Sequence, residues 1–118
     1  MSKQYIEKLV TRLETSKKLK ELGVVQLSCF RWLYDNEQEC YFLTDHSPHY
    51  FDCEITENYA AFTATEILTM RGYTRDIEIA QIYVSVDIEA DALIGSVKND
   101  CLDISEININ LQRFWEEK

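Results

Sequence analysis

Two cysteines and two histidines lie close together in the first half of the chain, and they are the side chains best suited to hold a metal ion. They are Cys40, His46, His49 and Cys53. Thiolates and imidazoles are ligands that zinc prefers, but the spacing C-x5-H-x2-H-x3-C matches no common zinc finger. Cys40 and Cys53 also fit apolar positions of expected strands, so we predict no metal and no cofactor. All four cysteines of the chain, including Cys29 and Cys101, are expected to be buried small apolar groups.

Either histidine could instead act as a general base, because Asp45 and Asp52 flank the pair and a carboxylate can orient an imidazole. Neither a glycine-rich phosphate loop nor a nucleophile in a strand-to-helix elbow accompanies them. Each of the three glycines is better explained as a helix end or a break. We predict that the chain is not an enzyme, with a metal-binding or hydrolytic site around His46 and His49 as an alternative.

Acidic residues dominate the body of the chain, which has a formal net charge of −9. Residues 1–23 carry six Lys or Arg against three Glu, whereas residues 24–118 carry six Lys or Arg against eighteen Asp or Glu. No basic residue except histidine occurs between Arg31 and Arg71. This field repels nucleic-acid phosphate and anionic lipid, so we predict neither as a direct partner. A basic protein is the natural complement, and acidity for solubility alone is the alternative.

Aromatic residues lie beside this acidic stretch. Phe30, Trp32 and Tyr34 alternate along one face of an expected strand, and Tyr41 lies on the returning strand. Rigid aromatic side chains anchor protein interfaces while charges steer the encounter, unless helices cover this face. The predicted partner-binding residues are Trp32, Tyr34, Asp35, Glu37, Glu39, Tyr41, Asp52 and Glu54.

The chain length of 118 residues suits one compact domain, residues 1–118. No apolar run approaches the roughly 20 residues that a bilayer-spanning helix needs. The stretch from Met1 to Val10 is charged and contains no apolar signal-peptide core. A cytoplasmic protein is therefore the expectation.

The first half of the chain predicts a helix followed by three strands in meander order. The helix is capped by Ser2 and ended by Gly23, with a bend or restart near Thr15 and Ser16. The strands are expected at 24–34, 40–44 and 51–56, with polar turns at 35–38 and 45–48 between them.

The second half predicts a helix at 57–71, capped by Thr56 and ended by Gly72. The strict alternation of residues 79–88 predicts a strand, and residues 92–97 suit either a short fifth strand or a helical turn. Asp103 and Glu106 predict a capping box that opens the last helix. The predicted fold class is α+β, an antiparallel sheet of four or five strands with helices packed on it, in the order α-βββ-α-β(β)-α.

Small size, acidity and a poor catalytic inventory resemble, in type, the proteinaceous inhibitors such as toxin-immunity or phage anti-defence proteins. That resemblance implies a partner that is a nuclease or another basic protein that handles nucleic acid. The expected order of elements is also similar to that of small dimeric secretion chaperones, which implies a homodimer or a groove for client peptides. Both expectations describe protein-binding chains, and they differ in oligomeric state and in the surface used.

Overall fold

The computed structural model describes residues 8–73 and 85–117, and within them the chain forms three strands and four α-helices. The strands are β1 (Phe30–Asp35), β2 (Cys40–Thr44) and β3 (Ile55–Ala61), with a short 3-10 helix, η1 (Pro48–Tyr50), between the last two. The helices are α2 (Leu13–Leu22), α3 (Ala64–Met70), α5 (Val86–Lys98) and α6 (Ile104–Glu116). The α+β class is confirmed, but the described order is α-βββ-ααα and the described sheet has three strands rather than four or five.

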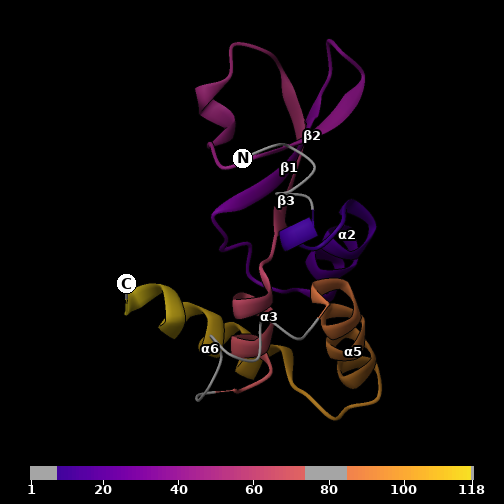
Figure 1. The fold of residues 1–118 in the computed structure, drawn as a ribbon, viewed down its shortest axis with the longest axis vertical. Coiled ribbons are helices and arrows are strands. Elements are labelled where there is room, and N and C mark those ends of the chain that lie inside the picture. Colours follow the sequence, from indigo (N-terminus) through magenta and orange to yellow (C-terminus); the bar gives the residue numbers. More distant parts are fainter. Residues whose placement is uncertain (1–7, 74–84, 118) are drawn as a thin grey trace.

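The tip of the sheet and the last three helices lie at opposite ends of the molecule (Figure 1). The β1–β2 turn and the η1 segment form one end, whereas α3, α5 and α6 form the other. Helix α2 contacts both β3 and α5, and α3 contacts α5 and α6. The core therefore lies where the base of the sheet meets the helices, and the tip of the sheet projects away from it.

The strand order is β2-β1-β3, so the expected meander is wrong. Both neighbours of β1 are antiparallel to it: Trp32 is paired with Leu43 on one side and with Tyr59 on the other. A meander would place the third strand beside the second. Here the segment 45–54, which includes η1, separates β2 from β3 and lets β3 pair with the open side of β1. As the central strand, β1 carries the fully buried Leu33.

The third strand and the helix after it lie further along the chain than the sequence predicts. Strand β3 begins at Ile55 and ends at Ala61, and α3 begins only after Thr63. Thr63 and Glu66 form a reciprocal capping box, in which each side chain bonds the other residue's backbone N–H. The predicted helix at 57–71 was wrong in its first half because pairing with β1 holds residues 57–61 extended.

The end of the predicted strand at 79–88 is helical. Residues 79–84 lie outside the described residues, whereas Ser85 is the N-cap of α5 and accepts a hydrogen bond from the backbone N–H of Ile88. Residues 92–97 belong to the same helix, so no fifth strand forms there. Ala90, Leu93 and Ile94 are buried at helical spacing, and this packing overrides the local alternation.

The ends of two predicted helices are confirmed. Gly23 ends α2 with a left-handed φ of 98°, and Asp103 caps α6 by accepting a hydrogen bond from the N–H of Ser105, not from that of Glu106 as in the predicted capping box. A helix restart is confirmed, but it lies at Leu13 rather than near Thr15 and Ser16, and α2 is continuous from there. The chain leaves helical geometry earlier, at Val10, which forms a bridge to Thr63. The Ser2 cap lies outside the described residues.

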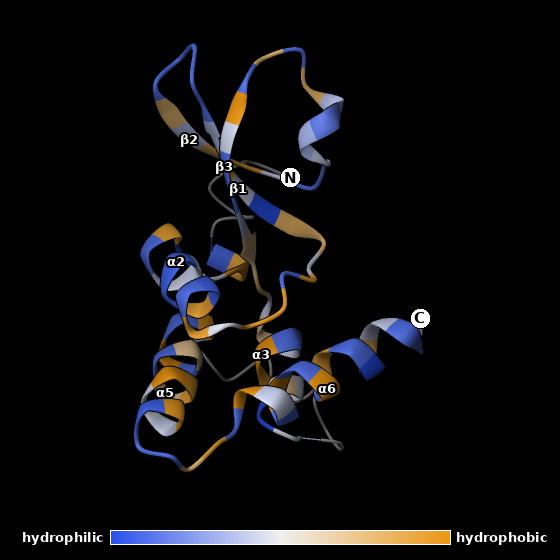
Figure 2. Ribbon diagram, turned by 180° about the vertical axis from the view of Figure 1, so that it is seen from behind, coloured by the Kyte–Doolittle hydropathy of each residue, from blue (hydrophilic) through white to orange (hydrophobic). Residues whose placement is uncertain are grey.

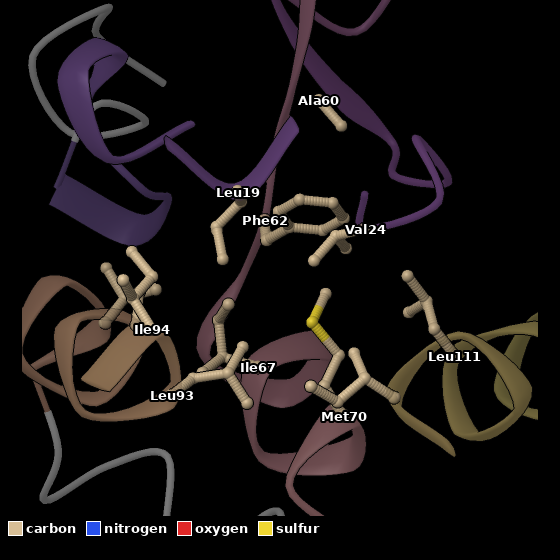
Figure 3. Close-up of a cluster of buried hydrophobic side chains, with 12 residues drawn as sticks. Leu19, Val24, Ala60, Phe62, Ile67, Met70, Leu93, Ile94 and Leu111 are labelled. Atoms are coloured by element: carbon tan, nitrogen blue, oxygen red, sulfur yellow. The ribbon is translucent and has the colours of Figure 1, made fainter. Parts of the chain in front are cut away.

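Phe62 lies between β3 and α3 in the middle of the core (Figure 3). The side chains packed around it come from all four described helices. Those that are fully buried are Leu19, Ile67, Met70, Ala90, Leu93, Ile107 and Leu111. The cluster that contains Phe62 thus joins the sheet to all four described helices.

Candidate functional site

The turn between β1 and β2 is held by the first of its acidic residues. The Asp35 carboxylate accepts hydrogen bonds from the backbone N–H groups of Glu37 at 2.9 Å and Gln38 at 3.2 Å. Glu39 closes the turn with a positive φ of 52°, a conformation that few non-glycine residues adopt. The side chains of Glu37 and Glu39 are consequently exposed at the tip of the sheet.

The segment just before β3 lies against this turn. The backbone N–H of Asn36 donates to the carbonyl of Glu54 at 3.1 Å, and the Asn36 side-chain amide donates to the Glu54 carboxylate at 3.2 Å. Burial and the carboxylates of Asp35 and Glu37 raise the pKa of the Cys53 thiol, so these groups share one electrostatic environment.

We call this surface the acidic end, and its residues are Asp35, Glu37, Glu39, Asp52 and Glu54. It joins two segments that are well separated in sequence, and its ribbon is coloured hydrophilic at the β1–β2 turn (Figure 2). All five residues were predicted as partner-binding, and four of them are exposed, Asp35 being half-buried by its role in the turn. The structure describes no Lys or Arg in the strands that carry it, apart from Arg31 at the opposite end of β1.

The predicted aromatic residues divide into two groups. The Trp32 indole N–H donates to the carbonyl of Thr11 at 2.9 Å, so this side chain fastens the segment before α2 to the sheet. Tyr34 and Tyr41 pack together on the same face with ring centroids 4.8 Å apart, nearer the acidic end. Both are half-buried, so only part of each ring is open to a partner.

A lysine of α2, which the sequence did not indicate as a site residue, lies against this aromatic pair. Lys17 of α2 donates to the Tyr41 hydroxyl at 3.1 Å and lies 4.7 Å from the centre of that ring. Glu57 accepts hydrogen bonds from the hydroxyls of Tyr41 at 2.8 Å and Tyr59 at 2.6 Å. These two bonds lower the pKa of Glu57, and the bond to Glu57 raises the pKa of Tyr59 to about 12. The only indication of this network in the sequence was that Lys17 and Lys20 lie three residues apart, on one face of a helix.

Replacing the carboxylate at the centre of this network tests its electrostatics. We expect Glu57→Gln to lower the pKa of Tyr59 from about 12 towards the ordinary value of 10.0, because the shift depends mainly on the bond to a charged acceptor. The check is an NMR titration of the Tyr59 ring carbon bearing the hydroxyl, assigned with Tyr59→Phe. An unchanged titration in Glu57→Gln would show that another group holds the Tyr59 proton.

The candidate metal ligands that the sequence offered, Cys40, His46, His49 and Cys53, do not converge. Among residues 8–73 and 85–117, no group of three or more His, Cys, Asp or Glu side chains is placed to hold a metal ion. His46 stacks on Tyr50 with ring centroids 4.0 Å apart and lies 3.5 Å from the Asp45 carboxylate, and His49 is exposed in η1. The prediction of buried cysteines was wrong, because Cys29, Cys40 and Cys101 are exposed and Cys53 is half-buried. Alternation along a strand indicates a face, not whether anything covers that face.

No family model, curated protein or solved structure matches this chain. No helix in the described part of the chain is both long enough and apolar enough to cross a membrane. The geometry and charge of the acidic end are therefore the features from which a function can be inferred.

Proposed function

We propose that this chain is a small acidic protein-binding inhibitor, of the kind that toxin-immunity and phage anti-defence proteins represent. Its target is a basic protein that handles nucleic acid, such as a nuclease, and its acidic end occupies the surface that would otherwise bind phosphate. The observation that carries the proposal is the convergence of five acidic residues from two segments at the tip of the sheet, distant from the core.

Electrostatics and packing support this use of the acidic end. The hydrogen-bonded turn gives its carboxylates a fixed spacing, as the backbone of a nucleic-acid strand gives its phosphates. Such a group of negative charges raises the rate at which a basic partner associates. Tyr34 and Tyr41 next to them supply rigid apolar surface that can be desolvated on binding. The dimeric chaperone alternative is weaker, because residues 86–97, where it calls for the end of a fourth strand and a fifth strand, belong to helix α5.

The first experiment is capture of target proteins from a lysate of the source cells by the tagged chain, washed at low and then at high salt. We expect one stoichiometric basic nuclease or nucleic-acid-binding protein, whose activity or nucleic-acid binding the purified chain then inhibits. Recovery of only the chain itself, or of a mixture of partly unfolded proteins, would contradict the proposal and favour the chaperone alternative.

Charge reversal then tests which surface binds the captured target. We expect Glu37→Lys, Glu39→Lys and Glu54→Lys together to slow association about 10- to 100-fold at low ionic strength, with a much smaller effect at high salt. The measurement is the association rate by stopped-flow fluorescence.

The matched control reverses three exposed glutamates at helix C-terminal ends, Glu21, Glu116 and Glu117, where lysine suits the helix dipole. It makes the same change in net charge and should slow association far less. Equal slowing by the two triple variants would mean that overall charge, not the acidic end, steers binding.

A further inference from the structure

The two edges of the three-stranded sheet differ in how far other parts of the chain bond their backbone groups. Along the free side of β3, three successive outward positions each have at least one backbone group bonded by another part of the chain. Lys20 donates to the carbonyl of Asn58 at 3.0 Å, and the N–H of Ala60 donates to the Gln26 side chain at 2.8 Å. Phe62 bonds Thr11 through both its N–H and its carbonyl. An added strand would have to displace these bonds over this stretch of β3.

The alternation of an antiparallel ladder shows which groups face outward on the other edge. The backbone groups of Asn58 and Ala60 point away from β1, so the residue between them, Tyr59, forms the backbone hydrogen bonds to its partner Trp32. The backbone groups of the next residue in β1, Leu33, then point towards β2. Leu33 is paired with Phe42, so the N–H and carbonyl groups of Tyr41 and Leu43 point outward from β2. Within residues 8–73 and 85–117, no group of the chain bonds these four backbone groups.

We propose that the outer edge of β2 binds an extended basic segment of a partner protein, which adds to the sheet as a fourth strand. The backbone groups of Tyr41 and Leu43 would pair with the segment. The charge around the edge selects its side chains: Glu37 and Glu39 precede β2, Asp45 follows it, and the chain offers no Lys or Arg from residue 32 to residue 70. The inference rests on the proposed function and specifies how the basic partner is held.

A second copy of this chain fits the edge poorly. Antiparallel self-pairing centred on Phe42 would place Glu39 of one copy opposite Asp45 of the other, twice in each pair of strands. Like charges directly opposite each other destabilise a sheet, and the net charge of −9 on each chain adds repulsion.

The edge itself carries no residue that would block an added strand. Natural edge strands are commonly protected by lysine or proline, and β2, with the sequence CYFLT, has neither.

Synthetic peptides test the inference without the natural partner. The probe is a fluorescent Lys-Val repeat peptide of about ten residues, the length of a long strand, and its binding is measured by fluorescence anisotropy. We expect saturable binding that falls at least about tenfold when consecutive central residues of the peptide are N-methylated, because main-chain hydrogen bonds are lost while the charge is kept. A Glu-Val peptide should not bind. Equal binding of the methylated peptide, or no binding of the Lys-Val peptide, would overturn the inference.

A proline substitution in the protein is the second test. Leu43→Pro removes an outward N–H that the β1 ladder does not use, so the fold should be retained, as circular dichroism and thermal unfolding would show. We expect about tenfold weaker binding of the Lys-Val peptide by Leu43→Pro, whereas Leu43→Ala keeps the N–H and most of the affinity. Should Leu43→Pro fail to fold, the methylated peptide still decides the question on the wild-type chain.

The same variant separates this inference from the proposed function. If reversing Glu37, Glu39 and Glu54 slows association with the captured target while Leu43→Pro leaves its affinity unchanged, the proposed function stands and strand addition is overturned. If no basic target is captured but the peptide binds at the edge, the proposed function fails and strand addition is supported. A dimer in sedimentation velocity that Leu43→Pro splits would assign the edge to a second copy and overturn the basic segment as its occupant.

Discussion

Phe62→Ala is expected to lower the free energy of unfolding by about 3 to 5 kcal/mol. The side chain is 0% exposed and lies in the middle of the cluster that joins the sheet to the helices (Figure 3). The substitution loses the favourable free energy of transferring a large aromatic group from water to the core. It also leaves a cavity that the surrounding helices close only in part. Urea unfolding followed by circular dichroism measures the loss.

The control for this change is Ile88→Ala. Ile88 is a large apolar residue of α5 that is 69% exposed, so its truncation should change the free energy of unfolding by less than about 0.5 kcal/mol. If Phe62→Ala costs no more than Ile88→Ala, the core does not depend on the junction between β3 and α3. The reversed-charge variants of the acidic end should also leave this stability nearly unchanged, because their side chains lie far from the cluster.

Glu66→Ala is expected to cost about 2 to 4 kcal/mol, because it removes a buried acceptor that three partly buried donors share. The Glu66 side chain is 2% exposed and accepts hydrogen bonds from Ser28 at 2.9 Å, from the Thr63 N–H at 2.9 Å and from the Trp115 indole at 3.2 Å. One carboxyl group thus joins the segment before β1, the start of α3 and the end of α6. Chemical unfolding of the variant measures the loss.

A matched control removes a glutamate from the same helical position elsewhere. Glu106 lies three residues after the N-cap of α6, as Glu66 does in α3, but it is exposed. Glu106→Ala should cost well under about 1 kcal/mol. Similar losses for the two variants would mean that Glu66 acts only as a helix-capping residue.

The cost of Glu66→Ala should also depend on pH. Burial raises the pKa of Glu66 above its ordinary value of 4.5, although the bonds from Thr63, Ser28 and Trp115 oppose the shift. A raised pKa means that the folded chain favours the protonated acid more than the unfolded chain does. The contribution of Glu66 is therefore greatest below its unfolded pKa and decreases as pH rises through its folded pKa. The difference between wild type and Glu66→Ala should be larger in acid, and a difference that grows with pH would contradict this assignment.

The residues that stabilise the core and the proposed binding surfaces lie in different parts of this molecule. Phe62 and Glu66 lie where the sheet meets the helices, whereas the acidic end and the open edge of β2 project from the other end of the sheet. Substitutions at the tip can therefore be interpreted as effects on binding once unfolding curves show that the core is unchanged.

Several elements could be predicted from sequence because their signals are local. The polar run after Asp35 predicted the turn, the apolar residues 40–44 predicted β2 at its observed bounds, and Gly23 and Asp103 predicted the ends of α2 and α6. In each case the residue type restricts its own backbone or bonds a neighbouring N–H, so no distant contact is needed. The acidic character of residues 32–70 was likewise a property of composition.

The elements that the sequence misplaced depend on distant partners. Residues 57–61 carry a helical stripe, yet pairing with β1 holds them extended, and residues 86–97 are helical because Ala90 and Leu93 pack into the core. The cysteines were assigned to the interior because free cysteine is usually buried, but exposure is decided by what covers each position.

By itself, then, the sequence determined the turn after Asp35, the caps at Gly23 and Asp103 and the sign of the charge, because each depends on a residue and its near neighbours. Only the tertiary structure decided that β3 pairs with β1 rather than β2, since that pairing requires the segment 45–54 to carry the chain around. The same pairing brings Glu54 to Asn36 and so assembles the acidic end from two segments. It also covers one edge of the sheet and leaves the backbone of Tyr41 and Leu43 open, because each strand can satisfy only the neighbour that the fold places beside it.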